Sequence, residues 1–291
     1  MKDGVYTDKE LSIEAYHEND SHVSASGLKA FQISPAHFKL SRSMPSQRKS
    51  HFDFGHAAEI KLLEPNQFND KVYVMDSKIV CDSIGGLRPT STKEFKAWKS
   101  GELELAGERY VIEKHGTESM DSINDIDTMC KNDKLISALL KNTQNQVSCF
   151  WTDKDTGVKL KTRPDIIHVN RNVIIDVKTT VDASPWGFGR SVTKFNYPIQ
   201  AVTQIDGVIA SGLMDTVDIY YYLVVQKVEP YLVQLYRMTD EDIQKARDKV
   251  SDLLMLFKMH KDGKLRDGYN YISDNKHGIL DLKIPQYYWY D

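Results

Sequence analysis

The apolar residues of this 291-residue chain alternate between helical spacing and short strand-like runs. Residues 53–64 show helical spacing and are followed by Pro65, which cannot continue a helix. Near the N-terminus, Ser24 or Ser26 is placed to cap a short helix, and Ser34-Pro35 begins another. Further helices are expected at about 92–99, at 119–141 with a break at Asn132-Asp133, at 194–210 and from Thr239 onwards.

Runs of β-branched and aromatic residues predict the strands. Two apolar runs, 165–169 and 173–178, are separated by the short polar turn 170–172 and form the centre of the pattern. Other strands are expected at 72–74 and 109–112, in a hairpin of 147–151 with 158–162, and in a hairpin of 218–226 with 231–237. The alternation predicts an α/β fold with a central mixed sheet flanked by helices.

The two central runs carry charged residues that strand propensity does not favour. Asp165 begins the first run, Asp176 lies near the end of the second, and Lys178 follows two residues later. The alternation of a strand places Asp176 and Lys178 on one face. If the runs pair, two carboxylates and an ammonium group converge at a sheet edge. Neighbouring carboxylates repel each other unless a cation lies between them, and Mg²⁺ prefers such oxygen ligands. This grouping indicates phosphodiester chemistry.

The segments Pro164-Asp165 and Asp176-Val177-Lys178 resemble the PD-(D/E)XK nucleases. More narrowly, the chain resembles their phage and prophage recombination exonucleases of the exonuclease VIII (RecE) type. The similarity covers roughly residues 4–236. The segments that carry it are 4–7, 26–38, 151–165, 176–180, Tyr197-Pro-Ile-Gln200 and Asp206-Gly207.

The resemblance implies a restriction-endonuclease-like core and Mg²⁺-dependent 5′→3′ digestion of linear double-stranded DNA from an end, leaving a 3′ single strand for recombination. Mn²⁺ is expected to substitute for Mg²⁺. A ring-shaped trimer or tetramer and a single-strand annealing protein as partner are also implied. Residues 1–118 would form a helical wall of the DNA channel and carry the first ligand helix, and 119–291 would form the nuclease core and C-terminal helix, within one integrated domain.

The helix at 53–64 departs from the family pattern at its metal ligand. The family has a glycine, a histidine four positions later, and then Leu-Glu-Pro. Gly55 and Leu63-Glu64-Pro65 match, which puts Glu59 in the place of the histidine. Other PD-(D/E)XK nucleases use a glutamate there, so we favour Glu59 as ligand. His56, one turn earlier, is the alternative or a phosphate contact, and a surface role for Glu59 remains open.

The site that we expect combines these residues. Glu59, Asp165, Asp176 and the carbonyl of Val177 would hold the metal, while Lys178 would orient the attacking water or stabilise charge on the phosphate. Gln200 would bridge the sheet edge to a phosphate or hold the water; a buried Gln–Tyr pair is the structural alternative. The expected DNA contacts are Arg163, Thr179, Arg190, Lys194, Tyr197 and His56. Gln144 and Gln146 lie where the family usually has a glutamate, which puts a second tight metal site in doubt.

The charge distribution fits a DNA-binding protein better than the net charge of −3 does. Residues 28–50 contain five basic residues and no acid, and residues 158–194 contain seven basic residues and three acids. The three cysteines are far apart in the sequence, which favours reduced thiols. Three cysteines are also too few for a four-cysteine iron–sulfur cluster. No apolar run approaches the roughly 20 residues of a membrane span, and no secretory signal begins the chain. We therefore expect a cytoplasmic protein of a bacterial or phage-infected cell, without membrane association.

Two alternatives to this function remain. A Cas4-like or restriction-like nuclease would share the site but cut differently. A DNA-binding relative without activity would explain the altered helix position and Gln146.

Overall fold

The computed structural model describes residues 1–43, 50–83, 92–273 and 277–289. Residues 44–49 of the basic stretch 28–50 lie outside the described residues. The centre of the fold is a five-stranded sheet in the order β10-β9-β8-β7-β4. Only the β8–β9 pair is parallel, so the sheet is mixed. The strands are β4 Gln144–Asn145, β7 Ile166–His168, β8 Val173–Thr180, β9 Ile219–Gln226 and β10 Val233–Arg237.

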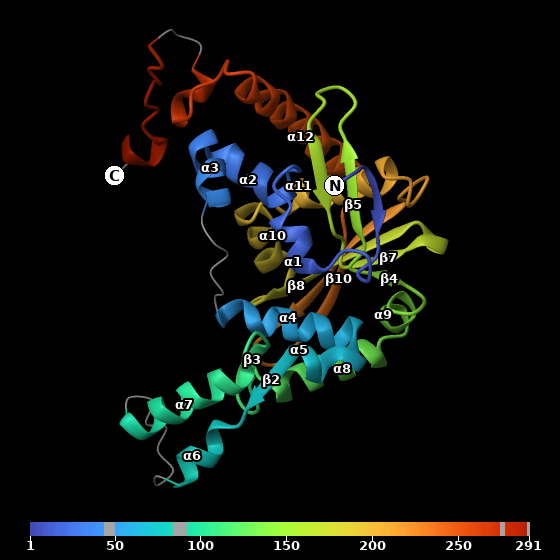
Figure 1. Cartoon of the computed structure of the whole chain (residues 1–291), viewed down its shortest axis with the longest axis vertical. Helices are drawn as coiled ribbons and strands as arrows, with labels where there is room; N and C mark the ends of the chain where they lie inside the picture. The colour runs from blue at the N-terminus through green and yellow to red at the C-terminus, as the bar shows by residue number, and fades with distance from the viewer. Residues whose placement is uncertain (44–49, 84–91, 274–276, 290–291) are drawn as a thin grey trace.

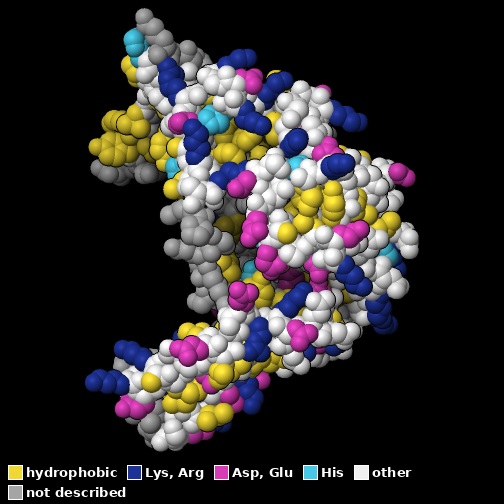
Figure 2. Space-filling model, viewed as in Figure 1, with side chains coloured by type: hydrophobic (Ala, Val, Ile, Leu, Met, Phe, Trp, Pro, Cys, Tyr) yellow, Lys and Arg dark blue, Asp and Glu magenta, His cyan; other side chains and the backbone are white. Residues whose placement is uncertain are grey.

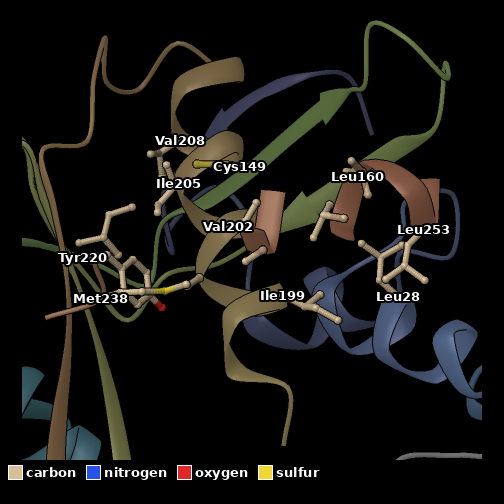
Figure 3. Close-up of a cluster of buried hydrophobic side chains, with 14 of the residues drawn as sticks. Leu28, Cys149, Leu160, Ile199, Val202, Ile205, Val208, Tyr220, Met238 and Leu253 are labelled. Carbon is tan, nitrogen blue, oxygen red and sulfur yellow. The ribbon is translucent and has the colours of Figure 1, made fainter. Parts of the chain in front are cut away.

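Helices cover both faces of this sheet, which confirms the expected α/β architecture (Figure 1). Successive residues of β8 point to opposite sides: Ile174 packs in one core cluster and Ile175 in the other. The cluster that contains Ile174 is drawn in Figure 3 and joins residues of α2 Ala25–Ile33, α11 Tyr197–Ala210 and α12 Asp240–Lys261. The other cluster joins α4 Ser50–Leu63 and α8 Met120–Asn132. Asp176 and Lys178 therefore face α11.

The turn that joins β7 to β8 explains why the two central runs pair as expected. A single 3₁₀ turn, Val169–Arg171, leads to Asn172, whose φ of 54° lies in the left-handed region. Asparagine tolerates this conformation better than most residues. The reversal aligns Ile166 with Ile175 in an antiparallel register.

The predicted hairpin is present and belongs to a second sheet. Its strands, β5 Ser148–Thr152 and β6 Lys159–Thr162, pair with β1 Gly4–Tyr6 in the order β1-β5-β6. Helix α11 packs on this sheet at Gly207, where an added Cβ would lie 2.6 Å from side chains of Trp151 and Thr162. Helix α11 thus lies between the two sheets.

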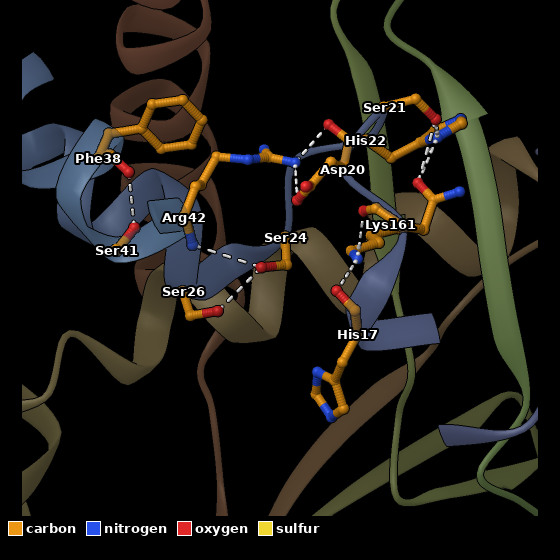
Figure 4. A network of polar contacts seen from close by, with 12 residues as sticks. His17, Asp20, Ser21, His22, Ser24, Ser26, Phe38, Ser41, Arg42 and Lys161 are labelled. Atoms are coloured by element: carbon orange, nitrogen blue, oxygen red, sulfur yellow. Dashed lines mark hydrogen bonds and ion pairs between the residues drawn. The ribbon is translucent and has the colours of Figure 1, made fainter. Parts of the chain in front are cut away.

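The N-terminal segment is fixed to the second sheet by a buried lysine (Figure 4). Lys161 of β6 donates to the carbonyls of Tyr16 at 2.5 Å and Asn19 at 2.8 Å, at the end of α1 Ile13–Glu18. Ser24 then caps α2, accepting from the N–H of Gly27. A second short helix, α3 Pro35–Ser43, follows.

A smaller lobe projects from the body at the lower left of Figure 1. It is built on the parallel pair β2 Val72–Met75 and β3 Tyr110–Glu113, with α6 Ser77–Ser83 and α7 Lys93–Ala106 outside it. Helix α5 Phe68–Lys71 leads into the lobe, and α9 Lys134–Leu139 follows α8 after the predicted break, with Asp133 as its N-cap. Between this lobe and the body the surface is hollowed (Figure 2).

Helices α1, α5, α6 and α10 Pro185–Lys194 were absent from our expectations, and α10 is the one that lies next to the candidate site. At the N-terminus of α10, Ser184 accepts from the N–H of Gly187. Lys194 therefore ends α10 and does not begin the next helix, and Asn196, with φ of 49°, separates α10 from α11. Among the described residues, none of the helices combines the length and hydrophobicity that a membrane-spanning segment requires.

Candidate active site

Asp165 and Asp176 meet at the edge of the β7–β8 pair, as the sequence predicted. Asp165 directly precedes β7, and its Oδ2 accepts a hydrogen bond from the backbone N–H of Val177 at 2.8 Å. Because Val177 adjoins Asp176 on β8, this bond draws the first acid to the strand that carries the second. The expected convergence of the two acids at the sheet edge is therefore present.

Asp176 is fully buried and is held by three side chains. Its Oδ1 accepts from Nε2 of Gln200 at 2.8 Å and from Nε2 of Gln204 at 3.2 Å. Its Oδ2 forms an ion pair with Nζ of Lys178. Tyr220 donates to the other end of the Gln204 amide, at 2.7 Å. The carboxylate orientation is thus determined by α11 and by the lysine on its own strand.

Glu59 reaches the same site from α4, and a glycine permits this approach. An added Cβ at Gly55 would lie 3.3 Å from Oγ1 of Thr179, so the helix and β8 are in close contact there. One turn later, Oε1 of Glu59 accepts from Nε2 of Gln146. Gln146 has a left-handed backbone, with φ of 54°. The position where the family has a glutamate is therefore a neighbour of the helical carboxylate.

Burial and the neighbouring carboxylates raise the pKa values of Glu59 and Asp165. Burial, together with the negative charge of Asp176, raises the pKa of Glu59 to about 7, although Lys178 opposes this rise. Burial, then the charges of Glu59 and Asp176, raise the pKa of Asp165 well above its ordinary value. Burial disfavours the charged form of Lys178, but Asp176 and Asp165 outweigh it and its pKa is raised. A cation among these oxygens would relieve their repulsion.

The donor set fits an oxygen-coordinated divalent ion in its chemistry, but it is not arranged as we expected. Among the described residues, no group of three or more His, Cys, Asp or Glu side chains stands ready to hold a metal. Glu59 and Asp165 each accept one hydrogen bond through one oxygen. Asp176 has both oxygens engaged by Lys178 and the two glutamines. Asp176 would have to leave Lys178 before it served as a ligand.

His56 lies one turn before Glu59 on α4. Its ring stacks on Tyr110 of β3, with centroids 4.6 Å apart and planes 21° apart, and burial lowers its pKa. It lines a cavity of about 290 Å³ together with Glu59, Gln146 and Arg163. Figure 2 shows carboxylates gathered around the middle of this face of the molecule. Of the two helical candidates, Glu59 is therefore the one beside Asp165.

Arg163 contacts protein groups instead of facing outward for DNA. Its guanidinium donates to the Leu11 carbonyl at 3.2 Å, to Oγ of Ser148 at 3.0 Å and to Oε1 of Gln146 at 3.2 Å. It also pairs with Asp8, and its side chain is 5% exposed. In this arrangement the guanidinium joins the N-terminal segment to Ser148 of β5 and to Gln146, so its donors are used within the protein. A DNA contact by Arg163 stays a prediction.

The other expected DNA contacts divide into two groups. Thr179 lies against Gly55, and Tyr197 lies beneath Lys178, whose Nζ is 5.0 Å from the ring centroid. Arg190 and Lys194 lie on the exposed side of α10, with Trp186, which is 76% exposed. Gln200 donates to Asp176, and no tyrosine pairs with it in the part of the chain that the structure describes.

Two residues near the site escaped the sequence reasoning. Gln204 received no role in the sequence analysis, yet its side-chain amide donates to Asp176. Lys29, on α2, lies over the ring of Tyr197 with its Nζ 5.5 Å from the centroid. Its position between two buried core residues, Leu28 and Phe31 on either side in the helix, was the only local signal.

Comparisons with known proteins agree with this fold. Residues 24–270 match a family described as a PDDEXK-like domain of unknown function (DUF3799). A crystal structure of a Eubacterium rectale protein described as a putative exonuclease is similar at a TM-score of 0.58 and 16% identity, over 94% of this chain and 95% of that one. A phage-related exonuclease of Haemophilus somnus 129PT gives a TM-score of 0.28 and 13% identity, over 67% of this chain and 98% of that one. No protein of curated function matches the sequence.

Proposed function

Because the chain belongs to the PDDEXK-like family DUF3799, we propose that it is a metal-dependent nuclease that hydrolyses DNA phosphodiesters. The observation that carries this proposal is the junction of β7 and β8. There Asp165 is bonded to the backbone beside Asp176, and Asp176 is paired with Lys178. Such a group of acids and a lysine has the chemistry that phosphodiester hydrolysis requires.

Each residue has a separate task in this proposal. Glu59, Asp165, Asp176 and the carbonyl of Val177 would hold Mg²⁺, or Mn²⁺ in its place. When bound, the ion would supply Lewis-acid stabilisation of the phosphate and help to ionise a water. Lys178 would leave Asp176 and stabilise the charge that develops on the phosphate oxygens. Gln200 and Gln204 would hold Asp176 in position while Lys178 moves.

The exposed cations of α10 would bind the DNA backbone. Arg190 and Lys194 stand one turn apart and lie on the helix that follows directly after β8. Thr179, Tyr197 and His56 would add further contacts to the DNA. Phosphate contacts of this type position a duplex without reading its sequence.

The resemblance to exonuclease VIII type proteins extends the proposal. We infer digestion of linear duplex DNA from an end, 5′→3′, with a 3′ single strand as product. A ring-shaped trimer or tetramer, a partner protein that anneals single strands, and action in the cytoplasm of a bacterial or phage-infected cell belong to the same inference. The three cysteines are free and buried, as a reducing compartment allows.

Two substrates test this function. Linear duplex DNA labelled at either the 5′ or the 3′ end, and the same DNA as a closed circle, are incubated with the wild type and Mg²⁺. We expect loss of the 5′ label first and no cutting of the circle. Cutting of the circle would favour a restriction-like or Cas4-like enzyme. Asp176→Ala should be inactive, while Asp252→Ala, an exposed acid on α12, serves as the control. Equal nucleotide release by wild type and Asp176→Ala would refute the assignment of the site.

A further inference from the structure

Two lysines from different parts of the chain share one aromatic ring at the site. Nζ of Lys178 on β8 lies 5.0 Å from the centroid of the Tyr197 ring, and Nζ of Lys29 on α2 lies 5.5 Å from it. The ring faces of tyrosine attract cations, so Tyr197 holds two ammonium groups near each other. Lys178 has Asp176 as its counter-ion.

Lys29 has no such counter-ion. Within residues 1–43, 50–83, 92–273 and 277–289, no carboxylate pairs with it. It is partly buried, because its helix is fixed by Leu28 and Phe31, both fully buried in the core. Burial, then the positive charge of Lys178, lowers the pKa of Lys29 to about 8, and Asp176 only partly offsets this. A partly buried ammonium group beside a second positive charge is stabilised when an anion binds to it.

The ring also connects this pair of lysines to the surface. Tyr197 stacks on Phe195, with centroids 5.6 Å apart, and Phe195 is 49% exposed at the end of α10. Nζ of Lys194 lies 5.3 Å from the centroid of the Phe195 ring. The exposed Lys194, the rings of Phe195 and Tyr197 and the two partly buried lysines therefore form one continuous row of contacts.

We propose that Lys29 is a second phosphate-binding cation of the active site, which contacts the backbone of the DNA strand held by Lys178, with Tyr197 as the positioning residue for both lysines. This inference rests on the proposed nuclease function and adds to it a residue from the N-terminal helices. The anion is identified by chemistry: a phosphodiester is the anionic group that the proposed substrate brings to Lys178. Helix α2, which carries Lys29, would thereby border the site on the side opposite to α4.

The test is DNA binding as a function of salt. The full chain, in EDTA so that no cleavage occurs, is titrated with a short fluorescent blunt-ended duplex at several salt concentrations. We expect Lys29→Met to bind roughly 10- to 100-fold more weakly than wild type. The slope of log K against log[salt] should become shallower by about 0.9, the value for one lost phosphate contact. Lys29→Arg should keep the wild-type slope.

A matched control is Lys154→Met at the tip of the β5–β6 hairpin, an exposed lysine that does not touch Tyr197. It removes the same charge and should leave the slope unchanged. Thermal melting verifies that each variant is folded, and Lys29→Gln takes the place of Lys29→Met if the methionine variant melts early. If Lys29→Met binds like Lys154→Met with the wild-type slope, while Asp176→Ala is inactive in cleavage, this inference alone is overturned. If Asp176→Ala cleaves like wild type, the proposed function itself fails.

Discussion

The side-chain amide of Gln200 donates to Oδ1 of Asp176 at 2.8 Å, and this bond joins α11 to the strand that carries the candidate catalytic acid. Gln204, one turn later, donates to the same oxygen at 3.2 Å. A buried carboxylate with two amide donors on one oxygen has a fixed orientation. Helix α11 therefore determines which way the other oxygen points, and that oxygen meets Lys178.

Removing the second amide should cost both stability and activity. Gln204→Leu leaves the buried hydroxyl of Tyr220 without its acceptor and takes one donor from Asp176. Such losses are worth about 1–3 kcal/mol each, and we expect a decrease of about 2 kcal/mol in the free energy of unfolding. Cleavage should fall about tenfold. Urea denaturation and nucleotide release measure the two effects. Gln244→Leu, on the exposed face of α12, is the control and should change neither.

The contact between α4 and β8 predicts a coupling between two residues. A glycine inside a helix is normally less favourable than alanine by about 1 kcal/mol. At Gly55, however, an added Cβ would meet Oγ1 of Thr179 at 3.3 Å. In the wild-type background, we expect Gly55→Ala to leave the free energy of unfolding nearly unchanged or to lower it. In a Thr179→Ala background, the same substitution should raise the free energy of unfolding by nearly the whole of this helix-propensity difference of about 1 kcal/mol. Chemical denaturation of the four proteins gives the coupling, and equal effects in both backgrounds would contradict the proposed close contact.

The raised pKa of Glu59 predicts how the stability of the metal-free protein depends on pH. An acid whose pKa is higher in the folded state stabilises that state below its unfolded pKa, and this contribution is lost as pH rises through the folded value of about 7. In EDTA, unfolding should therefore require less urea at pH 8 than at pH 5. The free energy attributable to Glu59 is on the order of 1–3 kcal/mol. Glu59→Gln should flatten this dependence, although Asp165 contributes with the same sign.

Mg²⁺ affinity should show the opposite dependence on pH. An ion that binds the ionised carboxylates competes with protons on Glu59, so affinity should rise between pH 6 and pH 8. Calorimetric titration with Mg²⁺ measures this, and Glu59→Gln should bind more weakly with a smaller pH dependence. Affinity that is equal at both pH values would exclude Glu59 as a ligand.

Arg163 should behave as a structural residue. Its guanidinium joins the Leu11 carbonyl, Ser148 and Gln146, a fork geometry that lysine cannot reproduce. Arg163→Lys should lower the free energy of unfolding by about 2–3 kcal/mol. The salt dependence of DNA binding should stay as in the wild type. If Arg163→Lys made the slope of log K against log[salt] shallower without lowering stability, Arg163 would instead be a DNA contact, as the sequence suggested.

The sequence was sufficient for features that depend on nearby residues. The β7–β8 pair follows from two apolar runs and a turn in which Asn172 accepts the left-handed conformation. Asp176 and Lys178 share a face because they lie two residues apart on a strand. Helix α4 and its end before Pro65 also depend on nearby residues, so the position of Glu59 within this helix could be predicted.

Features that depend on distant partners could not be predicted from the pattern. Arg163 looks like a free cation in the sequence, and its acceptor at Leu11 lies 152 residues away. The hairpin that precedes Asp165 belongs to a separate sheet, where β5 pairs with β1 from the N-terminal end of the chain. Lys29 carries no signal in the sequence, and the role that we propose for it depends on the packing of α2 against α11, which brings it to Tyr197.

The central claim is that Asp165 and Lys178 act in one metal-dependent site for cutting DNA. The most direct measurement is the release of acid-soluble nucleotides from linear duplex DNA by the wild type, Asp165→Asn, Lys178→Met and the exposed control Asp252→Asn, each with Mg²⁺ and with EDTA. We predict that the wild type and Asp252→Asn release nucleotides only with Mg²⁺, and that Asp165→Asn and Lys178→Met are at least about 100-fold slower while melting like folded proteins. Release by the wild type in EDTA, or undiminished release by Asp165→Asn and Lys178→Met, would contradict the account.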